Sequence, residues 1–339
     1  MRVFLFDEYN LMSEDVAKNT AYMTIASVAQ KVISFIYFTL VARLVGAEGT
    51  GKYFFALSFT TIFVIFIDMG LTNVLIREAS KFKQKAQTYF SNVFGVKLVL
   101  SILVYLGAII VINVMGYPEV TRNLVYLSAV TMVFDSLHKT NYGTIRSLGN
   151  LKWEAYGMVA SQAITLLLGS IFLIYDFPLI FLILAFTIPS CLNFIYSSFV
   201  LNKKYKIDLQ PKLRKNIIKK LGKIAAPFAL AAIFARGYSY LDTVILSKLA
   251  GDKAVGWYSI PRKIANAFQF FPMALVASLY PKFSEHYKNN KEDLTGLFEK
   301  SIKYMLLLAV PISVGIFIIA PEIINTFYTK EYLKSVLPL

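Results

Sequence analysis

Long apolar stretches recur along the whole of this chain of 339 residues. Nine of them are long enough to cross a bilayer, because a membrane-spanning helix needs about 20 mostly apolar residues. They lie approximately at residues 19–45, 53–76, 91–115, 122–146, 153–176, 178–201, 223–247, 254–281 and 302–321. The stretches are too long for membrane β-strands and do not alternate as such strands do. The sequence therefore predicts an all-α integral membrane protein with about nine transmembrane helices.

Composition agrees with this interpretation and excludes several classes of protein. Apolar residues make up 57% of the chain and charged residues only 16%, whereas a soluble domain is nearer half apolar and a quarter charged. A soluble enzyme and a disordered chain are therefore excluded. The single cysteine, Cys191, excludes a disulfide-linked secreted scaffold. We expect a multi-pass protein of the cell (plasma) membrane.

The net charge of +15 is distributed unevenly between the predicted loops. Lys and Arg are concentrated in the loops on the side that holds the N-terminus, and the longest basic run lies at residues 202–223. Cytoplasmic loops collect basic residues, so we expect the N-terminus to be cytoplasmic. Basic loops beside a membrane attract anionic lipid. This accounts for the charge without nucleic acid as a partner.

An internal repeat divides the chain into two parts. Residues 43–53 and 248–258 align without a gap and match Arg43 with Lys248, Gly46 with Gly251, Gly51 with Gly256 and Tyr53 with Tyr258. Each copy occupies a short outer turn between two predicted spans. Because the copies are six spans apart, both halves start from the same side of the membrane. The symmetry axis is therefore expected to run along the membrane normal.

This repeat predicts two pseudo-symmetric bundles. A cytoplasmic segment, 1–18, precedes an N-lobe of six helices at 19–201, and a basic linker at 202–222 leads to a C-lobe at 223–339. The C-lobe would hold three of an expected six helices, so we expect a C-terminally truncated chain. A genuine nine-helix protein is the alternative.

The residues around the repeat also resemble a known family. Residues 42–53 and the segment Asp68-Met69-Gly70-Leu71 closely resemble the start of polysaccharide-export flippases of the Wzx type, in the multidrug/oligosaccharidyl-lipid/polysaccharide exporter superfamily. Similar segments in the second half are 240–242, 251–258, Tyr280-Pro281 and 328–333. The resemblance implies two lobes around a cavity that opens alternately to each side and carries a lipid-linked oligosaccharide for cell-surface polysaccharide assembly. A polysaccharide polymerase or glycosyltransferases would be further partners.

Three basic residues are candidates for binding this substrate. A charge at bilayer depth costs at least about 2.5 kcal/mol on insertion scales, so it normally faces protein or a wet cavity. Lys31 lies near the middle of the first span and Arg236 in the seventh, and the repeat makes them equivalent. We expect both, with Arg262 as a third candidate, to bind the pyrophosphate of the lipid carrier. The alternative is snorkelling or an internal ion pair, and snorkelling is expected for Arg43 and Lys97.

Three carboxylates are candidates for a coupling-ion site or a gate: Asp68, Asp135 and Asp242. Asp135 precedes His138 and Lys139 by about one helical turn, so a local pair on one helix face is the alternative to an ion site. Asp242 and Arg236 lie on different faces of one helix, so we do not expect them to pair.

The sequence offers nothing for catalysis. The outer loops are each a few residues long, His138 and His286 are the only histidines, and there is no phosphate-binding loop or metal-ligand cluster. We therefore predict no enzymatic activity, no cofactor and no metal site. The predicted function is a flippase that moves a polyprenyl-pyrophosphate-linked oligosaccharide by alternating access. The alternatives are a cation-coupled drug or small-molecule antiporter of the same superfamily, and a non-transporting membrane scaffold or inactive fragment.

Overall fold

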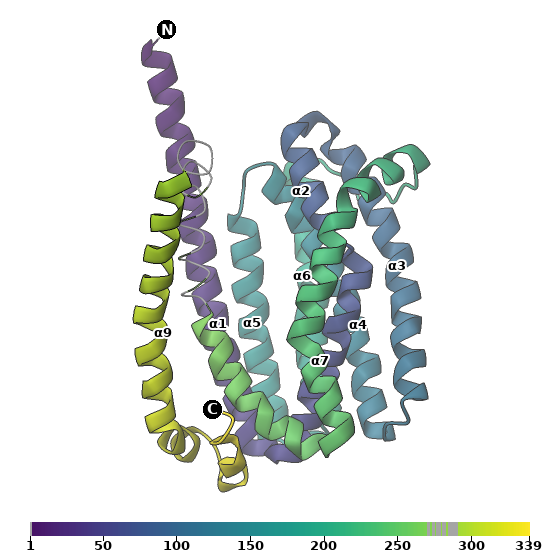
Figure 1. The fold of residues 1–339 in the computed structure, drawn as a ribbon. Coiled ribbons are helices and arrows are strands. Elements are labelled where there is room, and N and C mark those ends of the chain that lie inside the picture. The colour runs from purple at the N-terminus through teal and green to yellow at the C-terminus, as the bar shows by residue number, and fades with distance from the viewer. Residues whose placement is uncertain (1, 270–271, 273–274, 276–278, 280–282, 284–290) are drawn as a thin grey trace.

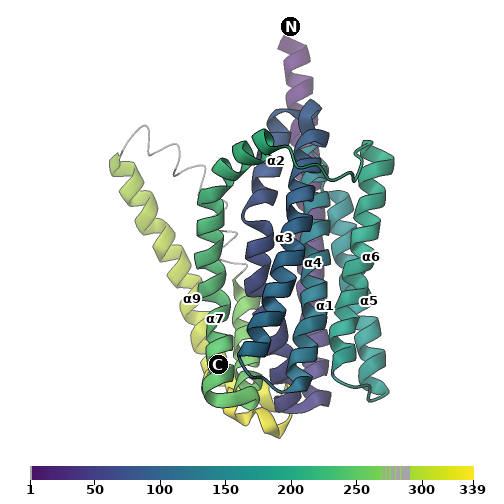
Figure 2. The ribbon, with the colours of Figure 1, turned by 90° about the vertical axis from the view of Figure 1, so that its right-hand side faces the viewer.

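The chain is a bundle of long helices in the computed structural model, which describes residues 2–269, 272, 275, 279, 283 and 291–339. In chain order the elements are α1 (Arg2–Asp68), α2 (Leu71–Lys81), the 3-10 turn η1 (Lys83–Lys85), α3 (Ala86–Val114), α4 (Glu119–Ser147), α5 (Lys152–Ile174), α6 (Ile180–Tyr205), α7 (Lys215–Phe268), α9 (Lys291–Phe327) and the 3-10 turn η2 (Lys330–Ser335). The described part of the chain contains no β-strand. The helices stand side by side in Figure 1 and Figure 2, and the predicted all-α class is confirmed.

Several helix boundaries differ from the predicted spans. α1 begins at Arg2 rather than near residue 19, and α7 begins at Lys215 rather than 223. An apolar run marks the part of a helix that lipid covers, and a helix can continue beyond it. The second predicted span, 53–76, is broken at Met69 and Gly70, which have positive φ angles. Tyr280 and Pro281, at the end of the eighth predicted span, and His286, beyond that span, lie outside the described residues.

The repeat is visible in the backbone of α1 and α7. Each consists of two helices joined at a glycine, Gly46 with φ 80° and ψ 173° and Gly251 with φ 79° and ψ 178°. A side chain at either position would be strained, because positive φ favours glycine. Both helices turn back at the lower end of the bundle in Figure 1, where the C-terminal end of the chain also lies. Equivalent positions of the repeat therefore make the same turn at the same end.

The two turns also pack against each other with the symmetry of the repeat. A Cβ atom on Gly51 would lie 1.8 Å from the backbone oxygen of Asp252, and one on Gly256 would lie 2.0 Å from the backbone oxygen of Ala47. Ala47 and Asp252 are themselves equivalent positions of the repeat. The turns thus interlock through backbone contacts that even an alanine would disrupt. We call this contact the glycine interlock.

The C-terminal turn η2 holds both repeat turns together. Trp257 Nε1 donates to the backbone oxygen of Glu331 at 2.9 Å, and Tyr332 donates its hydroxyl to Thr50 Oγ1 at 2.9 Å. Thr50 belongs to the first turn and Trp257 to the second. Burial raises the pKa of Tyr332 above its usual range, so its hydroxyl stays protonated for this bond. The lower end of the bundle is therefore closed by three segments.

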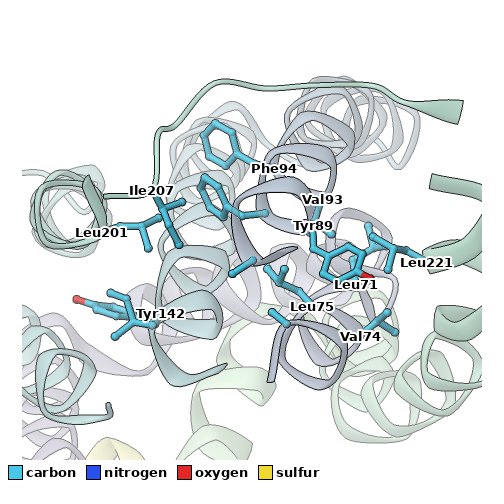
Figure 3. Close-up of a cluster of buried hydrophobic side chains, with 14 of the residues drawn as sticks. Leu71, Val74, Leu75, Tyr89, Val93, Phe94, Tyr142, Leu201, Ile207 and Leu221 are labelled. Atoms are coloured by element: carbon cyan, nitrogen blue, oxygen red, sulfur yellow. The ribbon is translucent and has the colours of Figure 1, made fainter. Parts of the chain in front are cut away.

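Apolar side chains form buried clusters at both ends of the bundle. At the end away from the glycine interlock, side chains of α2, α3, α4, α6 and α7 form the cluster in Figure 3. Its labelled members are Leu71, Val74, Leu75, Tyr89, Val93, Phe94, Tyr142, Leu201, Ile207 and Leu221. Near the interlock, Phe38 and Ala42 of α1 pack with Ile260 of α7, Ile324 of α9 and Tyr332 of η2. This second cluster ties α9 to the rest of the bundle.

The surface of the bundle is that of a membrane protein. Five segments of the described chain are long and apolar enough to cross a membrane: Lys18–Asp68, Lys83–Val114, Lys152–Ile174, Ile180–Tyr205 and Leu294–Phe327. Large apolar side chains are exposed, as at Leu167 (64%) and Phe317 (78%). The expected spans in α4 and α7 are not among the five, and both helices carry the polar side chains of the cavity described next.

The linker between the predicted lobes is fixed to α3. It is non-helical only from residue 206 to 214. Gln87 donates its amide to the backbone oxygen of Asp208 at 2.9 Å and accepts from the backbone nitrogen of Asp208 at 2.8 Å. The backbone nitrogen of Arg214 donates to Asn92 Oδ1 at 2.7 Å. The rest of the expected linker, from Lys215, is the first part of α7.

Candidate functional site

A polar cavity of about 330 Å³ lies between α7 and helices α1, α2, α4 and α5. Its charged lining residues are Asp68, Lys139, Arg146, Glu154 and Arg236, and we name it the Arg236 compartment. Asp68 ends α1, Arg146 lies in the last turn of α4 and Glu154 in the first turn of α5. The compartment therefore lies toward the end of the bundle opposite to the glycine interlock.

A second cavity of about 250 Å³ lies between α1, α4, α5 and α6. We name it the His138 compartment. Its polar lining residues carry hydroxyl, amide and ionisable groups. They are Gln30, Asp135, His138, Lys139, Tyr142, Glu154, Ser161, Gln162, Thr165, Ser190 and Asn193. It shares Lys139 and Glu154 with the Arg236 compartment, so the two adjoin.

A third cavity of about 200 Å³ lies between α1, α5 and the second half of α7. Its polar lining residues are Gln30, Lys31, Ser34, Gln162, Lys263 and Asn266, and we name it the Lys263 compartment. Gln30 and Gln162 also line the His138 compartment. The His138 compartment thus adjoins both of the others and lies between them.

Lys31 and Arg236 both line the cavity system, but in different compartments. Arg236 lines the first compartment and Lys31 the third. The expectation that they converge on one cavity is therefore not met by this geometry. Arg236 lies 5.9 Å from the centre of the Tyr240 ring and forms no ion pair with any described residue. A delocalised cation without a carboxylate partner is suited to binding an anion.

Arg262 differs from the expected pyrophosphate ligand because a carboxylate already binds it. Its Nη1 lies 2.5 Å from Asp242 Oδ1 and 3.0 Å from Thr243 Oγ1. Tyr258 donates its hydroxyl to the other Asp242 oxygen at 2.6 Å. This network joins the two halves of α7 and neutralises both charges. The internal pair expected as the alternative for Arg262 is present, and its partner is Asp242.

Asp68 forms a buried ion pair with Lys97. The Lys97 side chain is fully buried, its Nζ lies 2.5 Å from Asp68 Oδ1, and it donates to Thr72 Oγ1 at 2.7 Å. Thr72 also donates to the Asp68 carboxylate. The prediction that Lys97 snorkels to an interface is wrong. Its charge is compensated by Asp68, which lies two helices earlier in the chain. The pair joins the end of α1 to α3 at the break before α2.

Asp135 is held on the wall of the His138 compartment. Its Oδ1 lies 3.3 Å from His138 Nε2 and accepts a hydrogen bond from Ser190 Oγ at 2.6 Å. The local contact with His138, expected as the alternative to an ion site, is therefore present. Ser190 on α6 is a second partner that the spacing along α4 could not reveal.

The fold is similar to that of a solved transporter. The inward-facing conformation of a multidrug resistance MATE family transporter of the MOP superfamily superposes on this chain with a TM-score of 0.67 at 14% identity. The match covers 91% of this chain and 75% of that chain. At this identity the likeness concerns the fold.

The sequence decides the family. The profile of the polysaccharide biosynthesis protein family matches residues 16–286. The chain belongs to this family. It is 23% identical to the capsular polysaccharide biosynthesis protein CapF of Staphylococcus aureus, over 95% of this chain and 77% of that protein. It is 21% identical to a probable low-salt glycan biosynthesis flippase of Haloferax volcanii, over 94% of this chain and 66% of that protein.

These matches confirm the predicted resemblance and the multi-pass membrane location. The polysaccharide biosynthesis family accounts for the segments around the two repeat turns, which lie inside the matched range. The transporter fold agrees with it. The Haloferax relative is named as a probable flippase, and the solved neighbour is a transporter.

Two cations on the cavity walls of this polysaccharide biosynthesis protein were not among the binding residues predicted from the sequence. Lys139 was treated only as a neighbour of Asp135, yet it lines two compartments and forms no ion pair within the described ranges. Lys263 follows Arg262 directly and lines the Lys263 compartment. Adjacent residues of a helix point in different directions, so a carboxylate that pairs with Arg262 cannot also compensate Lys263. This signal was available in the sequence.

The charge of the cavity system is positive. Glu154 is compensated by Arg146, whose Nη2 lies 2.6 Å from it, and Asp68 is compensated by Lys97. Among the cations on the cavity walls that the structure describes, Lys139, Arg236 and Lys263 form no ion pair. The cavity therefore presents more free positive than free negative charge.

Proposed function

We propose that this chain moves a polyprenyl-pyrophosphate-linked oligosaccharide across the membrane. The observation that carries the proposal is the pair of cations, Arg236 and Lys139, on the walls of the Arg236 compartment, neither of which forms an ion pair with a described residue. Guanidinium and ammonium groups are the side chains that phosphates favour. The pyrophosphate would bind between them in this compartment.

The adjoining His138 compartment suits the sugar part of such a substrate. Its walls combine hydroxyls, amides and a histidine, and these groups donate and accept hydrogen bonds as sugar hydroxyls require. The names of the relatives agree, since one is a capsular polysaccharide biosynthesis protein and another a glycan biosynthesis flippase.

The same observations disfavour a cation antiporter. A site for an organic cation needs free carboxylates, but Asp68 and Glu154 are each bound by a lysine or arginine. Asp135 is the remaining carboxylate on the walls of the two larger compartments that the structure describes, and it contacts His138 and Ser190. We therefore favour an anionic substrate and leave a coupling role for Asp68, Asp135 and Asp242 unassigned.

Alternating access is the mechanism that we infer for the movement. The glycine interlock and η2 close one end of the bundle, and the Arg236 compartment lies toward the other end. The basic linker and the basic residues of α2 and η1 lie at that other end, which is the cytoplasmic side if positive loops face inward. Substrate would enter there, and the interlock would separate to release it outside.

Binding to the full chain in lipid nanodiscs tests the proposed site. The probe is a polyprenyl pyrophosphate that carries a neutral disaccharide. We expect Arg236→Gln and Lys139→Gln each to weaken binding about tenfold, since a hydrogen bond to a charged group contributes about 1.5 kcal/mol or more. The matched control is Arg43→Gln, because Arg43 is exposed and lines none of the three compartments. Equal affinity in all three variants would overturn the proposed site.

A further inference from the structure

The walls of the Lys263 compartment carry positive charge and no described carboxylate. Lys263 Nζ donates to Ser34 Oγ at 2.8 Å and lies 5.3 Å from the centre of the Phe38 ring. No carboxylate in the described ranges lies within ion-pair distance of it. The other described polar side chains on these walls are amides and Lys31. The site therefore combines two ammonium groups with hydrogen-bonding side chains.

This arrangement is costly unless an anion visits it. An ionised group at membrane depth is expensive without a charged partner, and one hydroxyl and one aromatic face offset only part of that cost. A methionine would fill the same space without the penalty. The lysine thus makes the compartment suitable for an anion and poor for a neutral or cationic group.

The position of the compartment indicates which anion this is. The His138 compartment lies between it and the Arg236 compartment, because it shares Gln30 and Gln162 with one and Lys139 and Glu154 with the other. With the pyrophosphate in the Arg236 compartment, the glycan occupies the middle one. Its far end then reaches Lys263. A second negative charge at that place belongs to a sugar rather than to the lipid carrier.

We propose that the Lys263 compartment binds the carboxylate of an acidic sugar, so that the substrate is an oligosaccharide that contains a hexuronic acid. This inference rests on the proposed function and adds the class of glycan to it. Lys263 supplies the charge, and the amides of Gln162 and Asn266 supply hydrogen bonds to the carboxylate and the neighbouring hydroxyls. Lys263 is therefore a specificity-determining residue.

A matched pair of probes tests this assignment. Both are polyprenyl pyrophosphates that carry a disaccharide, and they differ only in whether the terminal sugar is a hexose or the corresponding hexuronic acid. Binding to the full chain is measured in nanodiscs of zwitterionic lipid. The readout is the ratio of the two affinities. We expect the wild type to prefer the hexuronic acid about tenfold.

The variants then locate the preference. Lys263→Met lowers the ratio to about one, and Lys263→Arg restores most of it because the charge returns. Arg236→Gln weakens both probes and leaves the ratio unchanged. A ratio of one in the wild type, or an unchanged ratio in Lys263→Met, overturns the acidic-sugar site while the proposed function stands. Failure of the wild type to bind either probe overturns both.

One further arm separates a sugar carboxylate from a lipid head group. The same ratio is measured in nanodiscs that contain anionic phospholipid. A preserved preference supports the glycan carboxylate. Loss of the preference there means that lipid phosphate competes for the compartment, and this result contradicts the assignment to a sugar.

Discussion

Ion pairs inside this protein join segments that are far apart in the chain. Lys97 of α3 binds Asp68 at the end of α1, and Arg262 binds Asp242 across the two halves of α7. Burying such a pair adds little net stability, but removing one partner leaves a charge uncompensated. These ion pairs therefore hold segments of the bundle together.

The Lys97 pair leads to a test of stability. We expect Lys97→Met to lower the free energy of unfolding by about 3 kcal/mol, because the Asp68 carboxylate loses its charged partner. The measurement is denaturant unfolding in detergent. The control is Lys85→Met, because Lys85 is exposed. It should change the free energy of unfolding by less than about 0.5 kcal/mol. The double variant Asp68→Asn with Lys97→Met should recover part of the loss. Equal stability of Lys97→Met and Lys85→Met would mean that this pair does not form in the protein.

At the residue scale, the sequence predicted which charges are unusual but not how they are satisfied. The cost of a charge at membrane depth singled out Lys31 and Arg236, which line cavities, and Arg262, whose side chain is 10% exposed and paired with Asp242. Partner choice depends on tertiary distance, so the pairing of Arg262 with Asp242, twenty positions apart, could not be read from spacing. The burial of Lys97 was missed for the same reason.

At the scale of elements, the repeat turns were the most predictable feature. Glycines at equivalent positions predicted equivalent outer turns, and Gly46 and Gly251 have nearly the same backbone angles. The interlock of Gly51 and Gly256 was not predictable, because it depends on how close the two turns approach. The break at Met69 and Gly70 was also missed, since the apolar run continues through it.

The glycine interlock is expected to limit the access of solvent to its end of the bundle. Gly256→Ala places a Cβ against the backbone of Ala47, so the turns must separate. Thr50, fully buried at the interlock, is replaced by cysteine in a Cys191→Ser background. We expect a membrane-impermeant maleimide to label Thr50→Cys in intact cells severalfold faster when Gly256→Ala is present.

Two controls make this labelling test decisive. Gly107→Ala adds a Cβ that meets nothing within 4 Å and should leave the labelling of Thr50→Cys slow. Lys253→Cys, exposed beside the second turn, should be labelled in every background because this end is predicted to face outward. Equal labelling of Thr50→Cys with either glycine substitution would show that the interlock does not close this end. Unreactive Lys253→Cys would reverse the predicted orientation.

At the scale of the whole molecule, the helices combine a lipid-facing exterior with a positively charged interior. The sequence predicted the exterior well, because apolar runs report lipid exposure directly. It predicted one cavity, whereas the structure has three adjoining compartments with Arg236 in the first and Lys31 in the third. Lys139 and Lys263 also lie on the walls of these compartments. They do so because α4 and α7 pack against α1 and α5, and no local sequence pattern encodes that packing.

Transport itself tests the central claim most directly. The full chain is reconstituted into vesicles, and the flux of a fluorescent polyprenyl-pyrophosphate-linked disaccharide between the leaflets is measured. The wild type and Arg43→Gln should move the probe at similar rates. The double variant Lys139→Gln with Arg236→Gln should lose at least about tenfold of the flux, because the pyrophosphate loses two charged partners. Undiminished flux in that variant, or no flux above empty vesicles in the wild type, would contradict the account.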